Sequence, residues 1–87
     1  MHESSLIENL IKKIENVVGE QKAAEVRAVR VKLGALTNIS ADHFREHFVI
    51  GSKGTIAENA DLDIAVSDDI YDPNAQQILL EGLEVSE

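Results

Sequence analysis

The sequence predicts a two-layer α/β (α+β) sandwich in which two helices cover one face of a three-stranded sheet. The chain has 87 residues, which is the size of a single domain with a small core. Its apolar residues recur at helical or strand spacing in the order helix, strand, helix, strand, strand. Three strands cannot bury two amphipathic helices on opposite faces and still leave a polar face. We therefore expect both helices on the same face of the sheet.

The first helix is predicted from the apolar spacing of residues 6–18, where apolar side chains recur every three or four positions. Ser5 and Glu8 have the spacing of a capping box, which predicts a helix start at about Leu6. The end of this helix has two interpretations. Gly19 can terminate it, or the helix can continue for another turn.

A strand over Arg27–Leu33 follows the first helix. Its apolar side chains alternate with Arg30 and Lys32, so one face of the strand is apolar and the other is basic. The second helix is predicted to begin after Ser40, which is a favourable N-cap residue, and to end in the glycine-containing segment 51–55. Its buried stripe is predicted to consist of Ala41, Phe44 and Phe48.

Two strands are predicted near the end of the chain, joined by a loop over residues 67–77. In residues 61–66 apolar side chains alternate with aspartates. In the last strand the alternating apolar residues lie at even-numbered positions, 78 and 80, and then at odd-numbered positions, 83 and 85, so the alternation shifts by one residue. Gly82 at this change of phase indicates a β-bulge. We expect the following side chains to be buried: Leu10, Ile14, Val31, Phe44, Phe48 and Ile64.

The charge and composition exclude several classes of partner. The net charge is −8, which makes nucleic acid and anionic membranes poor partners. All 8 basic residues lie within residues 1–53, and we interpret the purely acidic remainder as a solvated surface. No segment has the pattern of a signal peptide or a membrane span, so we expect a cytoplasmic protein. The chain has no cysteine, which removes disulfides and every zinc site built on thiolates.

The first three residues are a candidate metal site. The Met1 amine, the His2 amide nitrogen and the His2 ring can form fused chelate rings on one ion. The Glu3 amide nitrogen, a carboxylate or a second imidazole can complete a square plane. Square-planar nitrogen donors suit Ni(II) or Cu(II). The alternative interpretation is an exposed histidine near a frayed terminus.

A second candidate lies on the second predicted helix, where His43 and His47 are four residues apart and face the same way. With Glu46 they match the H-x-x-E-H pattern of a protease family. We reject a protease, because an 87-residue chain has no room for the third ligand and a substrate cleft. The pair can share a metal ion, but we favour two histidines at the edge of the buried stripe. The sequence contains no nucleophile or phosphate-loop motif, so we expect no enzyme.

Five segments carry a resemblance to a known family: residues 1–6, which open with Met1-His2-Glu3, and residues 28–36, 44–48, 53–60 and 83–85. In this order they resemble the HypA family of nickel metallochaperones. The resemblance implies that Met1, His2 and Glu3 hold Ni(2+) for the maturation of [NiFe]-hydrogenase or another nickel enzyme. It also implies a HypB-type GTPase and the hydrogenase large subunit as partners.

The chain departs from this family in one respect. HypA proteins carry a zinc domain with two Cys-x-x-Cys pairs, inserted between the second and third strands. Here only the short loop 67–77 stands in that place. The resemblance therefore predicts a single nickel-binding domain over residues 1–87 without structural zinc, either natural or engineered by deletion of the zinc domain. A protein-interaction module of the same fold with no metal function is the alternative.

Overall fold

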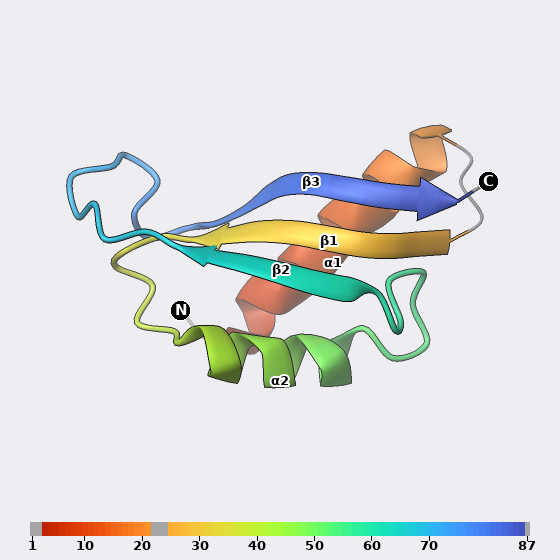
Figure 1. Ribbon diagram of the computed structural model, residues 1–87, viewed down its shortest axis with the longest axis horizontal. Coiled ribbons are helices and arrows are strands. Elements are labelled where there is room, and N and C mark those ends of the chain that lie inside the picture. The colour runs from red at the N-terminus through yellow and green to blue at the C-terminus, as the bar shows by residue number, and fades with distance from the viewer. Residues whose placement is uncertain (1–2, 22–24, 87) are drawn as a thin grey trace.

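The computed structural model describes residues 3–21 and 25–86, which form two helices and one sheet (Figure 1). The elements follow the predicted order: α1 (Glu3–Gln21), β1 (Glu25–Leu33), α2 (Ala41–Gly51), β2 (Asp61–Val66) and β3 (Ile78–Ser86). Strand β1 lies in the middle of the sheet, parallel to β2 and antiparallel to β3.

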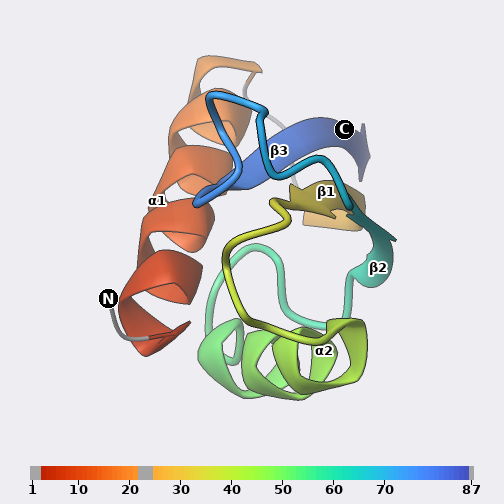
Figure 2. The same cartoon turned by 90° about the vertical axis from the view of Figure 1, so that its left-hand side faces the viewer.

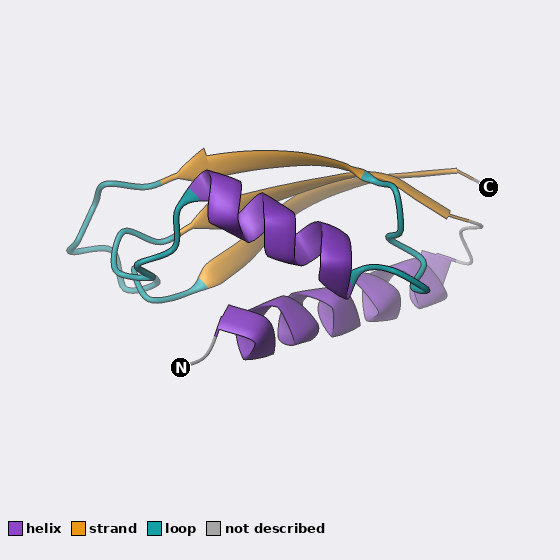
Figure 3. Ribbon diagram, turned by 90° about the horizontal axis from the view of Figure 1, so that it is seen from below, coloured by secondary structure: helices purple, strands orange, loops and turns teal. Residues whose placement is uncertain are grey.

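Both helices lie on the same side of the sheet, as Figure 3 shows from below. Helix α1 contacts β3, helix α2 contacts β2, and the two helices contact each other. In Figure 2 this arrangement is seen along the strands, with α1 and α2 enclosing the core against the sheet. The predicted two-layer α+β fold is therefore confirmed. Neither helix in the described ranges has the length and apolar character required to span a bilayer.

Helix α1 differs from its prediction at its start, and its end follows one of the two interpretations left open by the sequence. It begins at Glu3, three residues before the predicted start, so the inference from Ser5 as a cap was wrong. The spacing of a capping box also occurs inside helices, and neither proline nor glycine interrupts this turn. The helix also continues past Gly19 to Gln21, so Gly19 does not terminate it. The buried stripe agrees with the apolar spacing and contains Ile7, Leu10, Ile11, Ile14 and Val18.

Strand β3 contains the predicted bulge. Arg30 of β1 pairs with Gly82, whereas the next residue, Val31, pairs with Leu80, so Glu81 is the extra residue. The extra residue shifts by one the alternation between side chains that face the core and side chains that face away from it. As a result Leu80 and Leu83 both pack against the core although they lie three residues apart.

Helix α2 is capped as predicted. The Ser40 hydroxyl accepts a hydrogen bond from the His43 backbone N–H at 3.1 Å. Phe44 and Phe48 are 0% and 2% exposed, with ring centroids 6.1 Å apart. Ala41 is only half-buried, so the predicted stripe reduces to the two phenylalanines.

Five of the six side chains predicted to be buried are buried, and Ile64 is the exception. Ile64 is half-buried because β2 is an edge strand, and Val66 on the same strand is 59% exposed. On the central strand, by contrast, Val31 is 1% exposed. The extent to which these side chains are buried therefore depends on whether their strand is central or at an edge. The local alternation of apolar and polar residues does not show which strand is at the edge.

Residues 67–77 form a loop, as predicted, that folds back on the end of β1. The Leu36 N–H donates to the Ala75 carbonyl at 2.8 Å, and the Gly34 N–H donates to the Gln77 carbonyl at 3.0 Å. Ala75 is 3% exposed. The loop is therefore fixed to the sheet through backbone hydrogen bonds and a small buried side chain.

Candidate metal sites

The start of α1 carries the first candidate site. Met1 and His2 lie outside the described residues, and Glu3 is the first residue of the helix. The N-terminal chelate therefore stays a prediction. The structure does describe the first turns of α1, which begin at Glu3, and their contact with α2.

That contact is close. Ile7 and Ile11 are 3% and 6% exposed, and together with Glu8 they line a shallow groove against α2. On the α2 side the groove is lined by His47, Ile50 and Gly51. A side chain at Gly51 would lie 3.1 Å from the Ile7 Cγ2 atom, so the glycine allows this approach. The first turns of α1 are thus held in a fixed position against α2.

The second candidate is the histidine pair on α2, and the structure brings its two rings together. The ring centroids of His43 and His47 are 4.5 Å apart, and the ring planes are inclined by 57°. His43 is exposed and His47 is half-buried. Each histidine directly precedes a buried phenylalanine, so the pair lies at the edge of the apolar stripe, as the sequence predicted.

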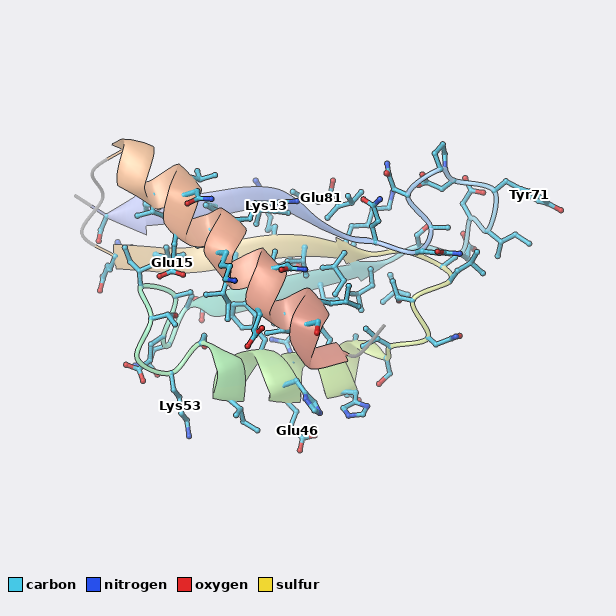
Figure 4. The ribbon with its side chains drawn as sticks, turned by 180° about the vertical axis from the view of Figure 1, so that it is seen from behind. Lys13, Glu15, Glu46, Lys53, Tyr71 and Glu81 are labelled. Atoms are coloured by element: carbon cyan, nitrogen blue, oxygen red, sulfur yellow. The ribbon has the colours of Figure 1, made fainter. Side chains whose placement is uncertain are left out.

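Glu46, the acid of the H-x-x-E-H pattern, is exposed on α2 (Figure 4). Among the side chains that the structure describes, no three His, Asp or Glu residues gather closely enough to hold one ion. Within this part of the chain the three-residue pattern therefore reduces to a pair of imidazoles.

One residue that lines the same groove as His47 was missed from the sequence. Glu8 of α1 lines the same groove as His47, although the two residues are far apart in the chain. No local spacing contains this relation, because it depends on how the two helices pack against each other. The sequence indicates only that Glu8 belongs to the first turns of an amphipathic helix.

The outer face of the sheet, away from the helices, has mixed charge. A hollow on it is lined by Arg30, Asp63 and Glu81, with Val31 and Ala65. A side chain at Gly82 would come within 2.5 Å of the Arg30 guanidinium, so Arg30 lies across the bulge. Part of the acidic sequence after residue 53 thus lies beside the basic face of β1, in agreement with a solvated charged surface.

Comparison with known proteins identifies relatives. A family model described as "Hydrogenase/urease nickel incorporation, metallochaperone, hypA" matches residues 1–71. "Hydrogenase maturation factor HypA" of Archaeoglobus fulgidus is 41% identical over 66 residues, which are 76% of this chain and 60% of that protein. The protein of the same name from Methylocella silvestris is also 41% identical over 66 residues, covering 76% of this chain and 58% of its own length. The chain thus spans about 60% of the length of these curated relatives.

Two solved structures have a similar fold. The solution structure of the Ni metallochaperone HypA from Helicobacter pylori superimposes with a TM-score of 0.80 at 18% identity, covering 99% of this chain and 98% of that one. A second solution structure, of a HypA protein, gives a TM-score of 0.73 at 20% identity, with coverages of 98% and 96%. At these identities the likeness establishes the fold.

Proposed function

The chain belongs to the HypA family, and from this premise we propose that it binds nickel at its N-terminus and delivers it for the maturation of a nickel enzyme. The observation that carries the proposal is the family match over residues 1–71, which includes the Met1-His2-Glu3 start. The role is that of a metallochaperone rather than an enzyme. The enzyme served is [NiFe]-hydrogenase or another nickel enzyme.

In this proposal the donors are the Met1 amine, the amide nitrogens of His2 and Glu3, and the His2 imidazole. Deprotonated amide nitrogens are strong donors that favour a planar, diamagnetic Ni(II) complex. The position of Glu3 at the start of α1 supports its part in the site. The first N–H groups of a helix have no acceptor within the helix, so the Glu3 nitrogen can bind metal without breaking a helical hydrogen bond.

The helix also assists electrostatically. The positive end of the α1 macrodipole lies at its N-terminus, where a deprotonated amide carries negative charge. The burial of Ile7 and Ile11 against α2 keeps this end of the helix in place. At the same donors Cu(II) binds more tightly than Ni(II), so selectivity in the cell comes from metal supply and partners.

The proposed partners are a HypB-type GTPase and the hydrogenase large subunit, and a cytoplasmic location is part of the same proposal. We further propose that residues 1–87 act as one nickel-binding domain, with the loop 67–77 in place of a zinc domain. Two observations support this. Strands β2 and β3 both pair with β1, and the loop between them bonds to residues after β1 through its own backbone. The absence of cysteine makes a thiolate zinc site impossible in this chain.

A nickel titration of three forms of the protein tests the N-terminal chelate. The forms are the chain with a free Met1 amine, the same chain acetylated at Met1, and the His2→Ala variant. We expect one planar, diamagnetic nickel equivalent in the first form and none in the other two. Glu3→Ala is the matched control and should bind with little change, because its backbone nitrogen remains.

A planar, diamagnetic nickel complex in the acetylated chain would show that the metal is held elsewhere. No nickel binding by the free-amine form would favour the alternative, an interaction module without a metal function. Circular dichroism of each form verifies that the fold is unchanged, which is expected because the core in the described residues contains no metal ligand.

A further inference from the structure

We propose that His43 and His47 form a second binding site for a divalent late first-row transition metal ion, separate from the N-terminal chelate. The site consists of two imidazoles on consecutive turns of α2. It does not depend on the proposed function, because none of its donors belongs to residues 1–3.

The distance between the two rings fits a shared ion. An imidazole nitrogen binds such a metal at about 2 Å, which puts the ring centroid about 3.2 Å from the ion. Two rings in neighbouring coordination positions, about 90° apart, then have centroids about 4.5 Å from each other. The centroids of His43 and His47 are 4.5 Å apart. Their inclination of 57° shows that the rings are not stacked flat on each other.

The backbone that carries the rings is held rigidly. Phe44 and Phe48 follow the two histidines and are buried in the core, which prevents α2 from rotating about its axis. Ser40 caps the same helix through the His43 N–H. Metal binding therefore restricts only the two side chains and leaves the backbone as it is, so little conformational entropy is lost.

The donor set defines the class of metal. Imidazole suits Ni(II), Cu(II) and Zn(II), and it suits Mg(II) and Ca(II) poorly. Each ring has two nitrogen atoms, so it can keep a hydrogen bond through one and bind the ion through the other. The net charge of −8 and the position of Glu8 along the same groove as His47 favour a cation.

Among the described side chains no third His, Asp or Glu joins the pair, so we expect water to complete the coordination shell. Nickel with two imidazoles and water ligands is six-coordinate and paramagnetic. Nickel in the N-terminal chelate is planar and diamagnetic. The two sites therefore have different magnetic signatures in one titration.

The experiment adds Ni(II) to the full chain acetylated at Met1 and follows the histidine ring signals by NMR. Acetylation removes the terminal amine, so the second site is observed alone. We expect paramagnetic broadening of the His43 and His47 ring signals with one equivalent of nickel. His43→Ala with His47→Ala on the same acetylated chain should weaken this binding by more than about tenfold, since even the loss of an outer-shell partner costs about 10–100-fold.

The matched control keeps the number of histidines and changes their spacing. His47→Ala combined with Val49→His moves the second ring to a position that is 55% exposed as valine and lies on another face of α2. This variant should also lose the paramagnetic site. Equal nickel binding by the control or by the double alanine variant, with unchanged circular dichroism, would overturn the proposal. So would the absence of ring broadening in the acetylated chain.

Failure of this proposal is distinguishable from failure of the N-terminal chelate. In the chain with a free Met1 amine, the double alanine variant should keep its planar, diamagnetic nickel equivalent. Loss of that equivalent in the variant would mean that the two histidines belong to the same site as Met1. That result would refute the separation of the two sites.

Discussion

Replacing Gly34 by alanine tests how the loop 67–77 is fixed to the sheet. Gly34 directly follows β1 and donates its N–H to the Gln77 carbonyl at 3.0 Å. A Cβ atom at this position would overlap the Ala75 carbonyl and would lie 2.8 Å from the Asn74 carbonyl oxygen. Because the obstacles are backbone atoms, a side-chain rotation cannot relieve the clash, and the segment 74–77 must move away.

The cost follows from the contacts that this movement breaks. The hydrogen bonds from Gly34 to Gln77 and from Leu36 to Ala75 are each worth about 1 kcal/mol. Ala75 is 3% exposed, and returning its methyl group to water costs about 0.8 kcal/mol. We therefore expect Gly34→Ala to lower the free energy of unfolding by about 3 kcal/mol.

Urea denaturation followed by circular dichroism measures this loss. With a slope of about 1–1.5 kcal/mol/M for a chain of this size, the midpoint should fall by about 2–3 M. Gly54→Ala is the control, since nothing lies within 4 Å of its Cβ position. It should cost only about 1 kcal/mol, because alanine is disfavoured at a φ of +78°. A loss below 1 kcal/mol in Gly34→Ala, or equal losses in both variants, would refute the steric argument.

Other predictions concern the helices and the metal. Phe48→Ala should cost about 3–5 kcal/mol in urea denaturation, because the ring is 2% exposed in the core. Ser40→Ala should cost about 1 kcal/mol by the same assay, because the N-cap acceptor for the His43 N–H is lost. Gly19→Ala should raise the midpoint of thermal unfolding, with a gain of about 0.5 kcal/mol, since the position is helical and open. Nickel affinity of the N-terminal chelate should rise steeply with pH in equilibrium dialysis, because binding releases protons from the amine and the amides.

Features encoded by a few neighbouring residues were predictable from the sequence. The Ser40 cap depends on one hydroxyl and the first turn of α2, and the structure contains the predicted hydrogen bond. The bulge at Gly82 depends on the change of apolar phase within one strand, and the pairing of Arg30 with Gly82 confirms it. In both cases the energetic cause lies within a short segment, so local chemistry was sufficient.

Features that depend on the assembled fold were not predictable. The alternation around Ile64 predicts its inward face correctly, yet the extent of burial depends on β2 being an edge strand. The start of α1 was predicted too late for a different, local reason, because the same Ser5 and Glu8 spacing fits both a cap and a helix interior. The position of Glu8 along the same groove as His47 depends on the packing of α1 against α2.

The order of the strands explains how the short loop 67–77 can connect β2 to β3. Strand β1 is central, so β2 and β3 lie on opposite edges and never pair with each other. The segment between them must therefore pass the end of β1, and residues 67–77 do so while bonding to Gly34 and Leu36. Any longer insertion at this place would start and end at the same end of the sheet, where β1 also ends, whereas the first turns of α1 lie against α2 (Figure 1). The support for the proposed N-terminal nickel site and the connection between β2 and β3 are thus built from different parts of the fold. For this reason we expect changes in the loop to alter stability far more than nickel affinity.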